Sequence, residues 1–282
     1  MLSKSNLFFS FIGGLFVLFL WNTFQEQKSM SESNSTSQNN QAVDTKGLNA
    51  LVLGGSGAVG KSVIRDLLTS GAFKAVTSLG RREVPYDGPN KDTLVQKLVN
   101  FEKIEESRDE MKNQDVVFCS FGTTKAAAGS AEAFVKIDKD YVISTAKLIH
   151  EENLSQDSQG TSDVHFIYVS SANANKNSWF LYPKTKGEIE EELSKIGFKR
   201  LSILQPGILY TEGERETPRL FESIVQKISA LTLEKTLGAS VATVARAMRW
   251  TASHSPKVAT PNEHGTVVEV LSNSEIHKLG MA

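Results

Sequence analysis

Tyr182 and Lys186 are the two residues whose types and spacing most directly suggest chemistry. They stand four positions apart in the segment YPKTKGEIEEELSKIGF, so on a helix they share one face. A neighbouring ammonium group stabilises a phenolate and so lowers the pKa of a tyrosine. A tyrosine tuned in this way can protonate a carbonyl oxygen while hydride arrives at the carbon. An exposed helical pair has the same spacing; the position of this pair after a predicted strand favours catalysis.

Ser170 and Ser171 come directly after the apolar run VHFIYV at residues 164–169. A hydroxyl at the carboxyl end of a parallel strand lies in the ligand crevice, where it can bond a substrate oxygen. Successive strand residues point to opposite faces, so the sequence leaves open which serine has this role. A serine-rich start of a loop is the alternative interpretation.

Three glycines, Gly54, Gly57 and Gly60, join the apolar run 49–53 to a segment with helical spacing. Glycine permits a tight turn, a close approach of the backbone to a pyrophosphate, and packing of the helix on the sheet. The helix N-terminus then faces the anion with free N–H groups. The spacing differs from GxGxxG, and a glycine triplet alone indicates only a turn. In a strand–turn–helix context it predicts dinucleotide binding.

Arg81 and Arg82 follow the second predicted strand, and Arg81 lies twenty-one residues after Gly60. An NAD site usually has a carboxylate near this point for the ribose 2′-OH. A guanidinium group instead matches a phosphate with a bidentate fork. The pair therefore favours NADP(H) over NAD, although two solvated arginines in a loop are the alternative.

Small residues end the fourth predicted strand, in the sequence FGTTK at 121–125. Gly122, Thr123 and Thr124 would let the nicotinamide-side ribose approach closely, and Lys125 offers a charge. The sequence predicts no metal site, because the five histidines are scattered without the spacing of metal ligands. The carboxylates Glu188, Glu190, Glu191 and Glu192 are interpreted as an exposed helix face.

The segments that must position these residues alternate between strand and helix. Near-continuous apolar strands between helices indicate a parallel sheet covered on both faces. We therefore predict an α/β Rossmann-type doubly wound parallel sheet with a small C-terminal substrate region from about Leu209. The predicted strands are 49–53, 75–79, 94–99, 115–120, 164–169 and 200–204, and the predicted helices are 59–69, 102–111, 132–152 and 180–196.

The N-terminal part of the chain has a different composition. Residues 7–21 read LFFSFIGGLFVLFLW and carry no charge. Fifteen helical residues rise about 22 Å, which is short against a hydrocarbon core of about 30 Å. We predict a hydrophobic membrane anchor or signal-anchor at 1–24, with a cleaved signal as the alternative. A polar, low-complexity stretch predicts a disordered linker at 25–47, followed by an NAD(P)-binding domain at 48–282.

Composition narrows the classes of protein further. The chain has 282 residues, 31 Lys+Arg against 32 Asp+Glu, and a formal net charge of −1. This balance argues against nucleic-acid binding, which usually appears as a basic excess. The one cysteine, Cys119, excludes an internal disulfide and a cysteine-rich metal site.

Together these motifs resemble the atypical short-chain dehydrogenase/reductases, and within them the Tat-interacting protein 2 group with its fungal mitochondrial outer-membrane relatives. The resemblance covers about 48–282. The motifs that carry it are GGSGAVG (54–60), LGRR (79–82), FGTTKAAAG (121–129), VKIDKDY (135–141), VSSA (169–172), FLYPKTKGEIE (180–190), LQPGILY (204–210), VARAM and EIHKLG.

The resemblance implies an NADPH-dependent reductase with Tyr182 as proton donor and Lys186 as its ribose-binding partner. It also implies NADPH contacts at Ser56, Gly57, Ala58, Val59, Arg81, Arg82, Phe121, Gly122, Thr123, Thr124 and Leu209. The chain departs from the family at Gln205, where an arginine often precedes Pro-Gly, and in an arginine expected shortly beyond. The departures concern the substrate end rather than the cofactor end.

We therefore expect hydride transfer to a small-molecule carbonyl substrate with a Ser-Tyr-Lys set. The rival is an NADPH-binding redox sensor or regulatory scaffold that engages a protein partner. An extended sugar-nucleotide enzyme is disfavoured, because about 70 residues after Leu209 leave little room for its larger C-terminal domain. The need for NADPH favours a cytosol-facing domain on the mitochondrial outer membrane or the endoplasmic reticulum.

Overall fold

The computed structural model describes residues 41–156, 160–211, 238–257 and 260–282. The predicted anchor at 1–24 and most of the predicted linker at 25–47 lie outside these ranges. Within them, no helix has the length and apolar character needed to cross a membrane.

A parallel sheet forms the centre of the fold, with strand order β3-β2-β1-β4-β5-β6-β9. This order reverses between β1 and β4, as in a doubly wound fold, and a ligand crevice is expected at such a switch point. The strands are β1 (Asn49–Leu53), β2 (Ala75–Gly80), β3 (Leu94–Leu98), β4 (Val116–Cys119), β5 (Ser162–Val169), β6 (Phe198–Gln205) and β9 (Val267–Ser272).

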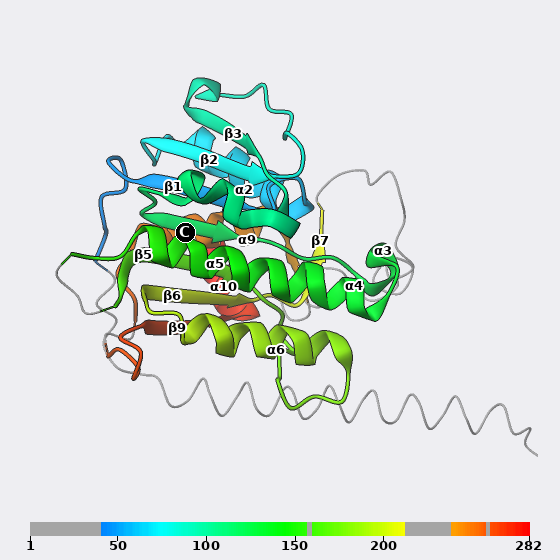
Figure 1. The fold of residues 1–282 in the computed structure, drawn as a ribbon. Coiled ribbons are helices and arrows are strands. Elements are labelled where there is room, and N and C mark those ends of the chain that lie inside the picture. The colour runs from blue at the N-terminus through cyan, green and yellow to red at the C-terminus, as the bar shows by residue number, and fades with distance from the viewer. Residues whose placement is uncertain (1–40, 157–159, 212–237, 258–259) are drawn as a thin grey trace, which may run out of the picture. The chain divides into compact units, whose positions relative to one another are not determined.

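Helices cover both faces of the sheet, with a separate apolar core on each side. In Figure 1, α5 and α6 lie in front of the sheet, and α2, α9 and α10 lie behind it. This arrangement buries both faces of the inner strands, which explains their near-continuous apolar runs. The covering elements are α2 (Ala58–Ser70), η2 (Phe101–Met111), α5 (Tyr141–Glu152), α6 (Leu181–Ser194), α9 (Val241–Ala252) and α10 (Asn273–Gly280).

The predicted helix 132–152 is interrupted. The structure has α4 (Ala131–Val135), a π-helical turn η3 (Lys136–Asp140), and then α5. Such turns are rare and often occur at functional sites. Likewise, the predicted helix 102–111 is a 3₁₀ segment with non-helical backbone at Lys103 and Ser107.

The C-terminal part contains elements that the strand pattern did not predict. A two-stranded parallel ladder joins β7 (Ile208–Tyr210) to β8 (Gly238–Ser240). The seventh sheet strand, β9, carries Glu269 within an apolar run, and its edge position leaves Val270 48% exposed. The remaining short elements are η1 (Lys91–Thr93) and α3 (Lys125–Ala128).

The folded unit includes residues before Leu48. Although residues 41–47 were assigned to the linker, Val43 N–H donates to the carbonyl of Ser253 at 2.8 Å, and Ser255 N–H donates to that of Gln41 at 2.9 Å. Thr45 is only 5% exposed. The folded unit therefore begins a few residues before Leu48, the position that the sequence pattern predicted.

A buried polar network joins β5, β6 and β9. The Ser202 hydroxyl donates to Glu269 at 2.5 Å, and His165 Nε2 lies 2.7 Å from that hydroxyl. Arg200 Nε donates to the same carboxylate at 3.0 Å, and another guanidinium nitrogen donates to the carbonyl of His254 at 2.6 Å. Because the serine proton is used by the carboxylate, Nε2 of His165 acts as the donor. Burial, followed by the charge of Arg200, holds the pKa of His165 well below its ordinary value.

Stability is therefore expected to fall as the pH drops below about 6.5, the ordinary pKa of histidine. A depressed folded-state pKa means that the unfolded chain binds more protons in this range. The contribution of His165 is complete above the unfolded-state pKa and is lost as the pH falls towards the folded-state value. One histidine gives a slope of at most about 1.4 kcal/mol per pH unit. Urea denaturation at about pH 7.5 and about pH 5.5 measures it.

The control for this prediction is His165→Gln, which keeps an amide donor for Ser202 but does not titrate. His150, whose pKa is also lowered by burial, is present in both proteins and cancels in the comparison. The free energy of unfolding of the variant should depend less steeply on pH. Parallel pH dependences in the two proteins would show that His165 is not the titrating group.

Candidate functional site

The glycine turn is built by contacts that only glycine allows. Gly54 has φ +81°, and a Cβ there would lie 2.8 Å from the backbone of Ser120. A Cβ on Gly60 would lie 2.2 Å from the carbonyl oxygen of Gly54, so a side chain would push α2 away from the turn. Gly57 is the N-cap of α2 and has no side-chain cap. The N-terminus of α2 is therefore open to an anion, and the turn lies against the end of β4.

Lys186, on α6, is the centre of a buried cluster of polar side chains. Its side chain is 3% exposed, and its Nζ donates to the Tyr168 hydroxyl at 3.0 Å. The same Nζ lies 3.1 Å from Asp138 Oδ2 and 6.0 Å from the centre of the Tyr182 ring. Burial opposes the charge of this lysine, but the neighbouring Tyr168, Asp138 and Tyr182 keep its pKa above the ordinary value. The predicted pair Tyr182–Lys186 is therefore part of a larger set.

Tyr182 stands at the edge of this cluster, in the first turn of α6. It is 43% exposed, and its ring centre lies 6.0 Å from that of the buried Phe134. The Tyr182 side chain thus has a buried cation on one side and contact with solvent on another. This position suits a group that exchanges a proton with a bound molecule. The preceding Trp179 and Phe180 are 100% and 74% exposed, so apolar groups flank the start of this helix.

Asp138 and Tyr168 were not among the predicted site residues. Asp138 is fully buried in η3, and its Oδ1 accepts a hydrogen bond from the backbone N–H of Thr123 at 2.7 Å. Tyr168 is fully buried in β5, and burial raises its pKa despite the nearby ammonium of Lys186. Asp138 lies within the motif VKIDKDY, but no spacing rule in the sequence predicts its contact with Lys186. The contact depends on the π-helical turn η3 and on the packing of α6 against it.

The two serines have different surroundings. Ser170 is 5% exposed, and its hydroxyl donates to the carboxylate of Glu190. Ser171 is half-buried, and no side-chain hydrogen bond of its hydroxyl is found within the described part of the chain. The structure therefore leaves the Ser171 hydroxyl available and commits that of Ser170.

Glu190 does not belong to an exposed helix face, as its neighbours in sequence suggested. It is half-buried and also accepts hydrogen bonds from Gln205 Nε2 at 3.0 and 3.1 Å. Burial raises its pKa, partly offset by the bonds from Ser170 and Gln205. Gln205, the residue at which the chain departs from the family pattern, is thus hydrogen-bonded to Glu190.

The segment Phe121–Thr124 is brought to the same place. A Cβ on Gly122 would lie 3.9 Å from both Asp138 Oδ2 and Lys186 Nζ, and the ring centre of Phe121 lies 4.8 Å from that of Phe101. Leu209 lies further along the chain in β7, where it pairs with Ala239.

Arg81 and Arg82 are exposed directly after β2, and neither forms an ion pair within the described part of the chain. Their side chains are therefore available for a ligand at the carboxyl end of β2. Ser56, Ala58 and Val59 belong to the turn and the first turn of α2.

Cys119 lies at the end of β4 but is unsuited to covalent chemistry. It is fully buried, and burial raises the pKa of its thiol to about 12. A thiol that stays protonated is a poor nucleophile. No group of His, Cys, Asp and Glu residues in the described ranges is arranged to hold a metal ion.

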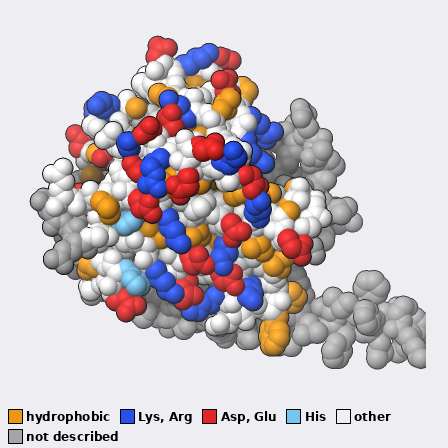
Figure 2. Space-filling model, viewed as in Figure 1, with side chains coloured by type: hydrophobic (Ala, Val, Ile, Leu, Met, Phe, Trp, Pro, Cys, Tyr) orange, Lys and Arg blue, Asp and Glu red, His pale blue; other side chains and the backbone are white. Residues whose placement is uncertain are grey.

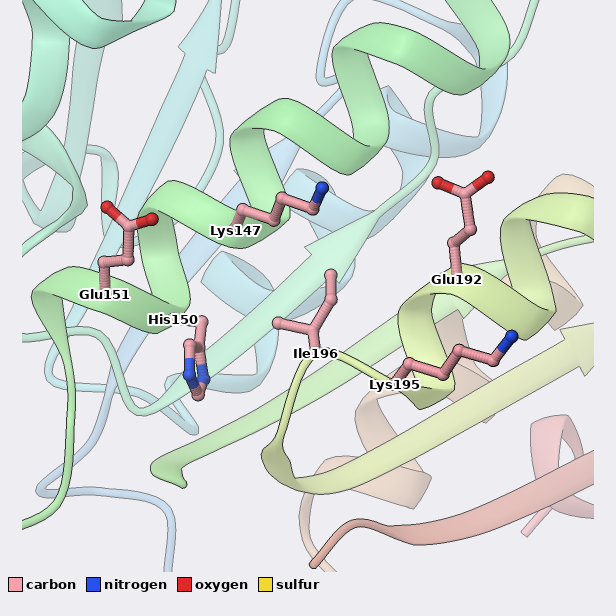
Figure 3. Close-up of a pocket in the computed structure, with 6 residues that line it drawn as sticks. All are labelled: Lys147, His150, Glu151, Glu192, Lys195 and Ile196. Atoms are coloured by element: carbon pink, nitrogen blue, oxygen red, sulfur yellow. The ribbon is translucent and has the colours of Figure 1, made fainter. Parts of the chain in front are cut away.

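A separate pocket of about 360 Å³ lies between the carboxyl-terminal parts of α5 and α6 (Figure 3). Its lining shares no residue with the predicted site and consists of Lys147, His150, Glu151, Glu192, Lys195 and Ile196. Figure 2 shows acidic and basic side chains interspersed over this face of the molecule. Lys139 of η3 forms ion pairs with Glu188 and Glu192 of α6, each at 2.8 Å.

The chain is similar to known proteins in sequence and in fold. A family model described as NAD(P)H-binding matches residues 54–248. Protein HTATIP2 of Rattus norvegicus is 35% identical over 167 residues, 59% of this chain and 65% of the rat protein, which is less than two thirds of its length. Protein FMP52, mitochondrial, of Candida albicans is 38% identical over 191 residues, 66% of this chain and 77% of that protein.

Solved structures show the same fold at low sequence identity. A short-chain type dehydrogenase/reductase from Mycobacterium ulcerans matches with a TM-score of 0.57 at 17% identity, over 83% of this chain and 91% of that one. MoeE5 in complex with UDP-glucuronic acid and NAD matches with a TM-score of 0.55 at 16% identity, over 79% and 75%. At these identities the likeness supports the fold alone.

Proposed function

This chain belongs to the atypical short-chain dehydrogenase/reductases of the HTATIP2 group, and we propose that it is an NADPH-dependent oxidoreductase that reduces a carbonyl substrate. NADPH, when bound, supplies the hydride. The uncapped N-terminus of α2 and the turn at Gly54 and Gly60 fit a pyrophosphate, and Arg81 and Arg82 fit a 2′-phosphate.

In this proposal Tyr182 protonates the carbonyl oxygen, and Lys186 binds the ribose and stabilises the phenolate that remains. Ser171 holds the carbonyl oxygen, because the hydroxyl of Ser170 is already bonded to Glu190. The observation that carries the proposal is the buried ammonium of Lys186 beside a partly exposed tyrosine on the same helix face. Burying a charged side chain is costly, and buried titratable groups with specific charged partners cluster at functional sites. This placement therefore supports a functional role for Lys186.

The test uses the full chain and begins with fluorescence titrations with NADPH and NADH. Oxidation of NADPH is then followed by absorbance with a panel of aldehydes, ketones and quinones. Tight NADPH binding together with turnover of at least one compound is the expected result. NADPH binding without turnover across the panel would instead favour a regulatory protein that senses the cofactor. Binding of neither nucleotide would overturn the proposal.

The location belongs to the same proposal. The apolar run 7–21 would anchor the protein in a membrane, with the reductase domain facing the cytosol, where NADPH is supplied. The name "mitochondrial" of the fungal relatives favours the mitochondrial outer membrane over the endoplasmic reticulum. Alkaline extraction of isolated membranes, followed by protease treatment of intact organelles, tests the anchor and the orientation.

A further inference from the structure

Asp138 connects two parts of the proposed site that come from distant segments of the chain. Its Oδ1 accepts from the Thr123 backbone N–H at 2.7 Å, which fixes the loop after β4. Its Oδ2 has no hydrogen bond within the described residues, but lies 3.1 Å from Lys186 Nζ in an ion pair. Both side chains of the pair are almost fully buried, at 0% and 3% exposure.

The charge of this carboxylate matters because the ammonium beside it is buried. A buried charge without a partner is strongly unfavourable, and the usual outcome is loss of the proton. Within the described residues, Asp138 is the carboxylate at ion-pair distance from Lys186. The hydroxyl of Tyr168 provides a second bond to Nζ but no full negative charge.

We propose that Asp138 is a positioning residue that keeps Lys186 charged and in place and fastens it to the loop 121–124. The inference rests on the proposed function for its catalytic meaning, but its electrostatic part concerns the protein without cofactor. The π-helical turn η3 is the structural device that brings the carboxylate to this position, since it displaces Asp138 from a regular helical path.

The groups that face this pair form one coupled set. They are Cys119 at the end of β4, Tyr168 on β5, and Tyr182 and Glu190 on α6. With Asp138 present, the ammonium is balanced by a carboxylate. Removing the carboxylate leaves a net positive charge in the same low-dielectric place. The set then releases its first proton at lower pH, whether from Lys186 or from a tyrosine.

Two substitutions separate the charge from the tether. Asp138→Asn removes the charge but retains an oxygen that can accept from the Thr123 N–H. Asp138→Ala removes both. Asp140→Asn is the matched control, because Asp140 is exposed, lies two residues away and carries the same charge. Circular dichroism and urea denaturation identify any variant that fails to fold.

The first measurement needs neither cofactor nor substrate. Proton release is titrated by potentiometry, which detects protons from lysine and tyrosine alike, and tyrosinate absorbance is followed in the same samples. The proteins are the wild type, Asp138→Asn and Asp140→Asn, each also prepared with Tyr182→Phe as a reference. In Asp138→Asn we expect the first titration step of the set to move down by about one pH unit or more, a tenfold or larger change in proton affinity. Asp140→Asn should match the wild type. Coincident titrations of all three proteins would overturn the inference.

The second measurement concerns the cofactor and the reaction. Asp138→Asn should bind NADPH within about threefold of the wild type, and Asp138→Ala at least about tenfold more weakly, because only the latter loses the bond to the loop. The alkaline limb of the pH–rate profile for reduction should shift down in Asp138→Asn. If the wild-type protein shows no turnover while the downward shift of the first titration step is present, the proposed function fails and the inference stands. If the wild-type protein turns over substrate but the alkaline limb is not shifted in Asp138→Asn, the proposed function stands and the inference about Asp138 fails.

Discussion

Replacing Tyr182 by phenylalanine is expected to lower kcat for carbonyl reduction by about 10²–10⁴-fold, the contribution typical of one positioned general acid. The substitution removes a single oxygen and keeps the ring, so the contact with Phe134 is retained. Because Tyr182 is 43% exposed, the loss of its hydroxyl should not destabilise the fold. Initial rates of NADPH oxidation, measured with a carbonyl compound that the wild-type protein reduces, give the effect.

Tyr86→Phe is the matched control, because Tyr86 lies in the segment between β2 and β3 and its hydroxyl bonds only a local carbonyl, that of Pro89, at 2.9 Å. This control should keep wild-type turnover. NADPH affinity should be nearly unchanged in both variants, since the hydroxyl acts on the substrate. Full activity in Tyr182→Phe would remove the proton donor from the proposed mechanism and turn attention to another acid near Lys186.

Local patterns were sufficient to predict much of the fold. The glycine turn between 49–53 and a helix, and the position of Tyr182 and Lys186 on one helix, follow from short-range rules of spacing. The six predicted strands all occur. The inner five are apolar because both of their faces are covered, whereas β3 lies at the sheet edge and is only partly buried. The seventh strand, β9, lies at the sheet edge and contains Glu269, so it lacks that signature.

The rest of the candidate site depends on tertiary contacts that no local pattern records. Asp138 reaches Lys186 across 48 positions of sequence only because η3 interrupts the helix and because α6 packs against it. The acidic run after Lys186 looks uniform in sequence, yet Glu190 turns towards Ser170 and Gln205. The same contact is the reason for proposing Ser171 rather than Ser170, since the hydroxyl of Ser170 already donates to Glu190.

Replacing both Arg81 and Arg82 by alanine is expected to weaken NADPH binding by about 10²–10⁴-fold while NADH binding changes little. The two nucleotides differ by the 2′-phosphate, and charge-assisted hydrogen bonds to such a group contribute about 1.5–3 kcal/mol each. Both arginines are exposed, so removing them breaks no ion pair or side-chain hydrogen bond within the described ranges. Fluorescence titrations with the two nucleotides, at one fixed ionic strength, measure the preference.

Fixed ionic strength is necessary because removing two positive charges also weakens the binding of any anionic ligand through long-range electrostatics, which salt screens. Arg65→Ala combined with Lys74→Ala is the control for this effect: both residues are exposed, lie beyond the glycine turn, on α2 and just before β2, and carry the same total charge. The control pair should weaken NADPH and NADH similarly and slightly, because a distant charge does not recognise the 2′-phosphate. Equal losses for both nucleotides in the Arg81/Arg82 variant would assign these arginines to general attraction. The origin of any NADPH preference would then have to lie elsewhere at the end of β2.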